Sequence, residues 1–234
     1  GEGRLPYFDG ETTSLPKLNE EQLLGFESIK KHFTEKDCVL LHGITGSGKT
    51  EVYIRLIQEA LDKGERVLYL LPEIALTTQI IVRLQKIFGD AVAVYHSKFN
   101  LNERVEIWNE LLNTQSKYKI ILGARSSLFL PFKNLGLIIV DEEHENTFKQ
   151  FDPAPRYHGR DMSLVLANIH NAKVLLGSAT PSVESYFNAK SGKYGLVELT
   201  KRYGGIQLPE VQCGDLKKDK KKKKMISLFT ELLK

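Results

Sequence analysis

The sequence has few of the residues that cross-link a chain or anchor it in a membrane. Of its 234 residues only two are cysteines, Cys38 and Cys213, too few and too far apart for a disulfide framework or a zinc site. No apolar run approaches the roughly eighteen residues that a membrane-spanning helix needs, and no signal-peptide pattern is present. These absences argue against secretion and against membrane insertion, and a reducing cytoplasm is the expected compartment.

Positive charge is scarcer in the body of the chain than its net charge of +4 suggests. The run KKDKKKKK, residues 217–224, holds seven lysines and one aspartate, a charge of +6, so the remainder of the chain sums to −2. Any surface that binds nucleic acid must therefore be confined to a small part of the chain. Because like charges in series repel, the run is interpreted as a solvated linker, with a phosphate-binding arm as the alternative.

The hydrophobic pattern alternates between strand-like and helix-like segments. A hydrophobic content of 41% in a chain of this length can bury one substantial core. The pattern predicts a helix from Asn19, strands near 38–42, 66–71, 91–95, 118–122, 136–141, 173–177 and 195–199, and helices near 50–63, 74–88, 101–113, 158–170 and 181–190. This order predicts an α/β domain over 18–204 with a mostly parallel sheet covered on both faces, an entry linker over 1–17 and a basic linker over 205–234.

The segment GITGSGKT, residues 43–50, lies between the first predicted strand and an amphipathic helix. It fits a phosphate-binding loop, in which glycines turn backbone N–H groups toward one point and the helix aims its positive end there. Lys49 is then expected to reach the β- and γ-phosphates and Thr50 to ligate Mg²⁺. A glycine-rich turn is the alternative. The predicted phosphate-binding residues are Gly43, Ile44, Thr45, Gly46, Ser47, Gly48, Lys49 and Thr50.

An acidic group follows the apolar run 137–140. Asp141 comes at the carboxyl end of that predicted strand, where open α/β sheets place their ligands, and is the candidate carboxylate for Mg²⁺. Glu142, one residue on, is the candidate for polarising the water that attacks the γ-phosphate. The alternative is a charged strand end that only faces water.

Seven short segments, in this order, resemble the superfamily 2 helicases. They are GITGSGKT (43–50), LPEIALT (71–77), VYHSKFNLNER (94–104), GARSSLF (123–129), DEEH (141–144), FKQFDPAPRYHGRD (148–161) and GSATPS (177–182). The residues of these segments are similar to those of the bacterial replication-restart helicases of that superfamily. The resemblance extends from about residue 18 to the C-terminus. The resemblance implies a RecA-like P-loop domain that uses ATP and Mg²⁺, and a 3′-to-5′ DNA helicase acting in replication restart.

The resemblance also implies roles on the nucleotide side. Asn19 and Gln22 match the motif that contacts the adenine, although an ordinary helix N-terminus explains them equally well. His144 matches the histidine that couples the nucleotide to the DNA, although a lone histidine is often structural. Ser178 and Thr180 match the motif that relays nucleotide state, through hydrogen bonds to Asp141 or His144; N-capping of the following helix is the competing interpretation.

On the DNA side, the resemblance implies that Thr77, Arg125 and Ser126 line a rim that holds the phosphates of single-stranded DNA. Arg125 could instead cap a carboxylate, and His96 is compatible with the rim or with local packing. The segment 148–161 mixes aromatic faces with cations, a pairing that suits unstacked bases; core packing of its rings is the alternative. Its candidate DNA-sensing residues are Phe148, Lys149, Phe151, Arg156, Tyr157 and His158, with Arg160 as a further cation.

A full helicase motor of this kind has a second lobe that supplies an arginine finger. The sequence shows no second sheet pattern, no arginine-finger motif and no Cys-rich zinc segment. We therefore expect a first helicase lobe within a longer protein, with zinc only in the remaining part. The implied partners are single-stranded or forked DNA, primosome proteins and single-strand-binding protein. The competing hypotheses are the lobe of another superfamily 2 translocase, a nucleotide-switched DNA-binding module and, least favoured, a small-molecule kinase.

Overall fold

A computed structural model of the chain describes residues 12–73, 75, 77–96 and 101–202. A seven-stranded sheet runs through this part in the order β3-β4-β2-β5-β6-β1-β7, and each pair of neighbours is parallel. The strands are β1 (Cys38–Gly43), β2 (Arg66–Leu70), β3 (Val92–Tyr95), β4 (Ile120–Gly123), β5 (Leu135–Asp141), β6 (Lys173–Ser178) and β7 (Gly195–Leu199). Parallel strands joined by helices bring the carboxyl ends of all seven to one edge.

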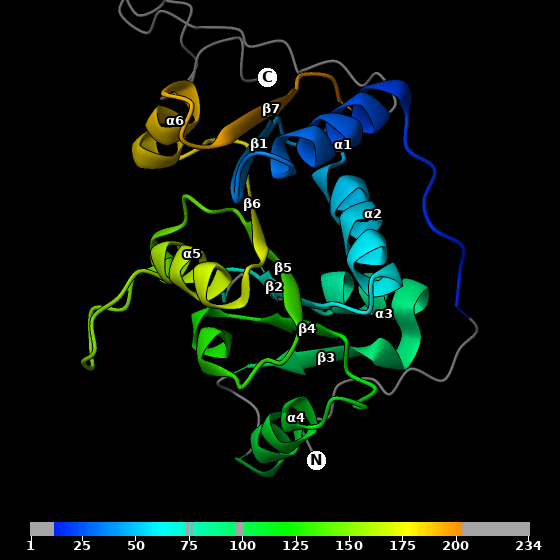
Figure 1. Cartoon of the computed structure of the whole chain (residues 1–234), viewed down its shortest axis with the longest axis vertical. Helices are drawn as coiled ribbons and strands as arrows, with labels where there is room; N and C mark the ends of the chain where they lie inside the picture. The colour runs from blue at the N-terminus through cyan, green and yellow to red at the C-terminus, as the bar shows by residue number, and fades with distance from the viewer. Residues whose placement is uncertain (1–11, 74, 76, 97–100, 203–234) are drawn as a thin grey trace, which may run out of the picture. The chain divides into compact units, whose positions relative to one another are not determined.

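Helices cover both faces of this sheet (Figure 1). On one face lie α1 (Glu20–Phe33), α2 (Lys49–Asp62) and α3 (Thr78–Phe88), and on the other α4 (Leu101–Leu112), α5 (Gly159–His170) and α6 (Val183–Lys190). Short 3₁₀ turns, η1 (Gly89–Ala91), η2 (Arg125–Phe129) and η3 (Asn146–Phe148), complete the order. The α/β architecture with a covered parallel sheet is confirmed.

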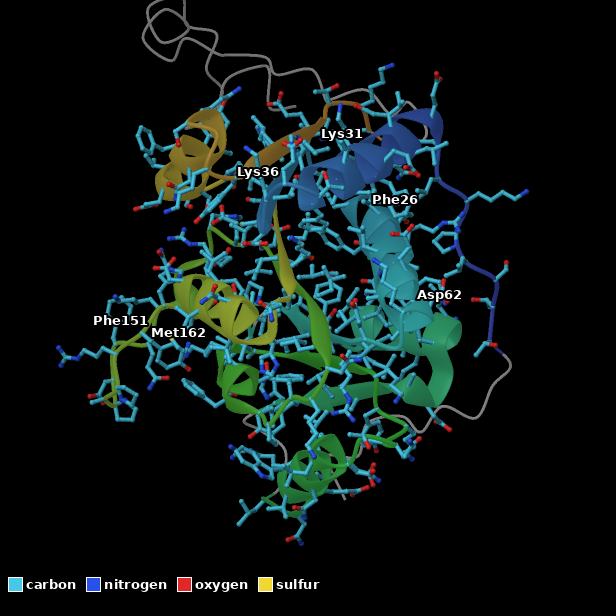
Figure 2. All side chains as sticks on the ribbon, viewed as in Figure 1. Phe26, Lys31, Lys36, Asp62, Phe151 and Met162 are labelled. Carbon is cyan, nitrogen blue, oxygen red and sulfur yellow. The ribbon has the colours of Figure 1, made fainter. Side chains whose placement is uncertain are left out.

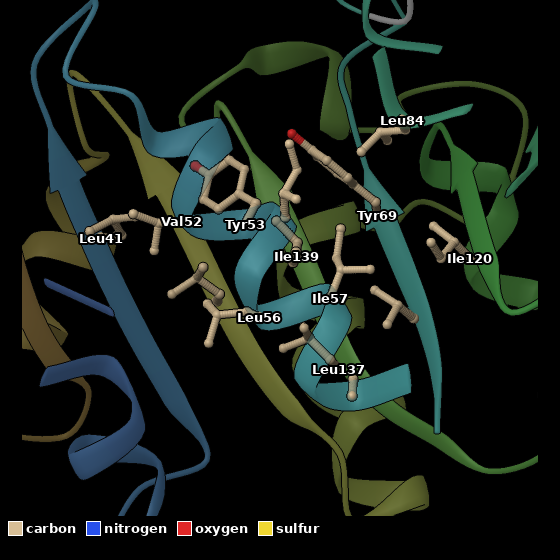
Figure 3. Packing of buried hydrophobic residues seen from close by; sticks show 14 of the residues in the cluster. Leu41, Val52, Tyr53, Leu56, Ile57, Tyr69, Leu84, Ile120, Leu137 and Ile139 are labelled. Carbon is tan, nitrogen blue, oxygen red and sulfur yellow. The ribbon is translucent and has the colours of Figure 1, made fainter. Parts of the chain in front are cut away.

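The core has two layers because successive side chains of a strand point to opposite faces. In β5, Leu137 and Ile139 pack under α2, whereas Ile138 and Val140 pack on the side of α5. Figure 3 shows α2 lying over the sheet, with Ile57 of the helix near Ile139 of β5. Nearly every strand residue is buried, which is why these strands read as continuous apolar runs in the sequence.

Each predicted strand and helix of the body has a counterpart. The one boundary that moves by several residues is that of α3, which begins at Thr78 where the pattern placed a helix near 74; Ile74 and Leu76 lie outside the described residues. Leu15 packs against the core and Thr13 bonds the Lys86 carbonyl, so the described end of the predicted entry linker contacts the body. The lysine run, the rest of segment 205–234 and residues 97–100 also lie outside the described part.

Within the described ranges, no helix is both long and apolar enough to cross a membrane. Cys38 is a buried free thiol of β1, whose burial raises the pKa. Cys213 lies among the residues that the structure does not describe.

Candidate nucleotide site and DNA-facing rim

The predicted phosphate-binding loop joins β1 to α2. Gly46 and Gly48 have φ of 79° and 83°, the left-handed region that glycine enters without a steric penalty. Gly48 is also the N-cap of α2, and because it has no side chain, no capping group covers the first amides of the helix. Lys49 Nζ donates to the carbonyl oxygen of Gly43, 2.8 Å away, across the mouth of the loop. The loop thus presents N–H groups, a helix N-terminus and one ammonium to the same space.

Asn19 and Gln22 fasten the start of α1 to this loop. Asn19 caps the helix by accepting from the Gln22 amide, and the Gln22 side chain accepts from the Asn19 amide, both at 2.9 Å. The buried Gln22 Nε2 then donates to the carbonyl oxygens of Ser47 and Gly48, at 3.2 and 3.4 Å. A Cβ on Gly48 would lie 2.0 Å from that nitrogen and would displace the Gln22 amide, and the left-handed φ of Gly48 favours glycine as well. The helix-capping interpretation describes both residues, and the adenine contact stays a prediction.

Asp141 is the last residue of β5 and has the same parity as Leu137 and Ile139. Its carboxylate therefore points to the face covered by α2, where it meets the phosphate-binding loop. It accepts hydrogen bonds from the hydroxyls of Tyr53, 2.9 Å away, and Tyr69, 3.1 Å away. Burial raises the pKa of Asp141, an effect opposed by the two hydroxyls and by the charge of Lys49.

Glu142 follows with a φ of 49°, a left-handed conformation that is costly for a residue with a Cβ. Burial and the neighbouring charge of Asp141 raise the pKa of the Glu142 carboxyl above its ordinary value. A carboxylate with a raised pKa is a better proton acceptor near neutral pH, so this electrostatic environment is compatible with the predicted role of Glu142 in polarising water.

These groups surround one pocket of about 340 Å³. Its lining residues are Thr45, Gly46, Gly48, Lys49, Thr50, Glu51, Arg83, Asp141 and Glu142. A hydroxyl and a carboxylate are hard oxygen ligands of the kind Mg²⁺ takes when nucleotide phosphates complete its shell. Among the described residues, no cluster of three or more His, Cys, Asp or Glu could hold a metal unaided. Because Thr50 and Asp141 line the same pocket, they fit a Mg²⁺ ion whose other ligands include nucleotide phosphates. Such an ion would polarise the phosphoryl oxygens.

The pocket includes an ion pair that the sequence did not reveal. Arg83 of α3 bonds Glu51 in the first turn of α2, so it brings a second cation to the rim of the phosphate-binding loop. Nothing in the helical pattern of α3 distinguishes Arg83 from an ordinary solvent-facing residue.

His144 joins the acidic motif to the segment after β6. Its Nδ1 lies 2.7 Å from Ser178 Oγ, and its Nε2 lies 3.3 Å from Thr180 Oγ1. The carboxylates of Glu142 and Glu145 stand 3.7 and 3.9 Å from the ring nitrogens. The helix cap of α6 is Ser182, which accepts from the Ser185 amide, so Ser178 and Thr180 are not the capping residues. These contacts are the kind of hydrogen bonds expected for a relay of nucleotide state through Ser178 and Thr180. The relay itself stays a prediction.

Glu143 is the residue of this motif to which the sequence assigned no role. Its side chain is completely buried and accepts from Arg160 Nη1 (3.2 Å), from the Ser182 amide and hydroxyl (2.7 and 2.9 Å) and from the Ser185 hydroxyl (2.7 Å). Arg160 is thus turned inward by an ion pair, and is not a free cation for DNA as the sequence suggested. Only the tertiary fold brings these three segments together.

Arg125 and Ser126 follow β4, and Thr77 precedes α3 after β2, so all three lie at the carboxyl edge of the sheet. Thr77 is exposed and Ser126 half-buried. Arg125 donates to the Thr147 carbonyl and, at 3.4 Å, to Gln150 Oε1, which ties it to the base of the aromatic segment and not to a carboxylate. His96, which directly follows β3, is buried. The phosphate contacts of the rim stay predictions.

The aromatic segment divides into buried and exposed rings. Phe148 is only 1% exposed and packs in the core, so core packing, the alternative to stacking on a base, describes this residue. Phe151 is 67% exposed and projects from the body (Figure 2). Tyr157 packs edge-on against Phe129, with ring centroids 5.2 Å apart.

The two arms of the segment are paired at its base. Lys149 and His158 form an antiparallel bridge, and the Gln150 amide donates to the Tyr157 carbonyl at 2.8 Å. Lys149 and Arg156 are exposed beside Phe151. His158, the N-cap of α5, is half-buried, and burial together with the charge of Arg160 lowers its pKa, which favours the neutral form. Of the predicted DNA-sensing residues, one ring and two cations are therefore exposed, and their contact with a nucleic acid stays a prediction.

Comparison with known proteins places this chain in a family. Residues 22–188 match the DEAD/DEAH box helicase model. The chain is 42% identical over 221 residues to the replication restart protein PriA of Bacillus subtilis, covering 92% of this chain and 27% of that protein. It is 43% identical over 206 residues to the PriA protein of Rickettsia felis, covering 88% and 31%. The chain thus spans less than a third of the length of these relatives.

Solved structures agree on the fold. The chain resembles RecG bound to a three-way DNA junction (TM-score 0.59, 23% identity, covering 82% of this chain and 25% of that one). It also resembles the Hef helicase domain of Pyrococcus furiosus (TM-score 0.53, 17% identity, covering 79% and 38%). With a parallel sheet, a phosphate-binding loop facing an acidic strand end and a family model that matches most of its length, the chain belongs to the DEAD/DEAH box helicase family.

Proposed function

We propose that this chain is the ATP-binding first lobe of a DNA helicase motor. Residues 43–50 would hold the triphosphate, with Lys49 on the β- and γ-phosphates, and Thr50 and Asp141 would hold Mg²⁺. Glu142 would orient and polarise the attacking water. The hydrogen-bonded contact of His144 with Ser178 and Thr180 is the observation that carries the proposal, because it links this acidic motif to a second strand end beside the DNA-facing edge.

We further propose that the carboxyl edge of the sheet binds single-stranded or forked DNA. Thr77, Arg125 and Ser126 would contact its phosphates, and Phe151, Lys149 and Arg156 would take an unstacked base and its flanking phosphates. The similarity to proteins named for replication restart favours that process, with 3′-to-5′ translocation, in the cytoplasm, and with primosome and single-strand-binding proteins as partners. Zinc would belong to the part of the parent protein outside this chain.

The lobe alone is expected to bind Mg-ATP weakly and to hydrolyse almost none of it. An arginine finger is worth roughly 10³- to 10⁵-fold in the rate of such reactions, and the sequence has no motif for one. The measurement is phosphate release by the purified chain with and without single-stranded DNA. A DNA-stimulated turnover near one per second, on the scale of a complete enzyme, would contradict the single-lobe proposal.

Replacing Lys49 by alanine is expected to weaken Mg-ATP binding by about 10- to 100-fold, since a charge-assisted hydrogen bond is worth about 1.5–3 kcal/mol. Titration of a fluorescent ATP analogue measures this. Lys63→Ala is the matched control, because Lys63 is an exposed lysine at the opposite end of the same helix. Wild-type affinity in both variants would show that Lys49 does not contact the phosphates.

No observation favours another superfamily 2 translocase or a nucleotide-switched binding module over this proposal. An experiment on the whole parent protein distinguishes a motor from a nucleotide-switched binding module. A motor requires that ATP alter the affinity for DNA and that DNA stimulate hydrolysis, whereas a module switches affinity without displacing a strand. A strand-displacement assay on a forked duplex distinguishes the two.

A further inference from the structure

Two tyrosines that no motif includes determine how Asp141 is presented to the pocket. Tyr53 belongs to α2 and Tyr69 to β2, and both side chains are completely buried. Their rings meet edge to face with centroids 5.7 Å apart, and Figure 3 shows both between α2 and the sheet. Buried rings in contact cannot swing their hydroxyls away, so the two O–H groups are fixed donors to the carboxylate.

The hydrogen bonds of Asp141 are distributed unequally over its two oxygens. Oδ1 accepts from the Tyr53 hydroxyl (2.9 Å) and from the Glu142 amide (3.1 Å), and Oδ2 accepts from the Tyr69 hydroxyl (3.1 Å). An ionised carboxylate offers about four acceptor positions, two on each oxygen. Three are therefore used by residues that the structure describes, and the fourth is on Oδ2.

Gly177 makes this arrangement possible. It lies on β6 beside Asp141, and a Cβ at this position would be 1.7 Å from the Tyr53 hydroxyl oxygen and 3.4 Å from Asp141 Oδ1. Any side chain at residue 177 would displace the Tyr53 hydroxyl. The pair of tyrosines thus depends on a glycine in the neighbouring strand as well as on its own two elements.

We propose that Tyr53 and Tyr69 are positioning residues that leave Asp141 a single acceptor position, on Oδ2, for the metal or for a water bound to it. This inference rests on the proposed function. Asp141 then serves as a one-point ligand, which suits the small octahedral Mg²⁺ shell. Ca²⁺, which takes more ligands and often both oxygens of a carboxylate, is disfavoured. The site would therefore select Mg²⁺ over Ca²⁺ by withholding Oδ1.

The test uses the whole 234-residue chain and a fluorescent ATP analogue, titrated in EDTA, in Mg²⁺ and in Ca²⁺. Removing the hydroxyl in Tyr53→Phe frees an acceptor position on Oδ1 and loosens the carboxylate. We expect the Mg²⁺ concentration at half-saturation to rise about 10-fold, as for other residues that orient a metal ligand. We also expect the half-saturation concentrations for Mg²⁺ and Ca²⁺ to become more similar. Affinity in EDTA should stay at the wild-type value, because the phosphate-binding loop is unchanged.

The control is Tyr194→Phe, which removes the hydroxyl of a buried tyrosine that precedes β7, at the opposite edge of the sheet. It should leave both metal titrations unchanged. Tyr69→Phe provides a second test should Tyr53→Phe fail to fold, and thermal melting shows which variants are folded. A folded Tyr53→Phe or Tyr69→Phe chain with wild-type Mg²⁺ and Ca²⁺ dependence would overturn the proposal, even with a lower melting temperature. A wild-type chain that binds no nucleotide in any condition would overturn the proposed function itself.

Discussion

Replacing Glu143 by alanine is expected to lower the free energy of unfolding by about 3–5 kcal/mol, the cost of breaking a buried ion pair by removing one partner. The substitution leaves the Arg160 guanidinium buried beside two serine hydroxyls that lose their acceptor. Denaturant unfolding of the variant and the wild type measures the difference. Such a loss is large, because domains of this size are stable by only about 5–15 kcal/mol.

Two further variants isolate the cause. Glu145→Ala removes an acidic side chain two residues away that is 34% exposed, and should change stability by no more than about 0.5 kcal/mol. Adding Arg160→Met to Glu143→Ala should recover part of the loss, since it removes a guanidinium that has lost its buried partner and keeps, among the described residues, only the exposed Asp161 carboxylate as an ion-pair partner. A Glu143→Ala chain within about 1 kcal/mol of the wild type would mean that the network does not stabilise the fold.

Alanine substitutions at Phe148 and Phe151 are expected to have opposite consequences. Phe148→Ala empties a packed core position and should cost about 3–5 kcal/mol of stability. Phe151→Ala removes an exposed ring and should leave the free energy of unfolding within about 0.5 kcal/mol of the wild type. Its effect should appear instead in binding to single-stranded DNA, weakened by about 1–3 kcal/mol, the range for loss of one stacked base.

The measurements are denaturant unfolding and fluorescence anisotropy of a labelled oligonucleotide. Val183→Ala is a matched control for Phe151→Ala, because Val183 is an exposed apolar residue of α6 outside the aromatic segment. Unchanged DNA affinity in Phe151→Ala would remove this ring from the proposed interface. A Phe148→Ala chain as stable as the wild type would contradict its place in the core.

The strands and helices could be predicted from the sequence because the local signals for each element agree with one another. Buried parallel strands read as short apolar runs, and amphipathic helices follow each of them, so the strands and helices could be placed along the chain. The glycines at 46 and 48 could be expected from the phosphate-binding pattern, since left-handed φ values are a local requirement. Asp141 could be assigned to the carboxyl end of its strand because the apolar run that precedes it is also a local signal.

Contacts between distant segments were decided by the tertiary structure alone. The sequence marked Phe148 and Phe151 as similar rings and Arg160 as a free cation, but their burial depends on how α5 packs against β5. Tyr53, Tyr69 and Gly177 come from three elements, and only the strand order β2-β5-β6 places them around Asp141. A hydrophobic pattern records which face of an element is buried, whereas the partner across the core is chosen by the packing of the whole sheet.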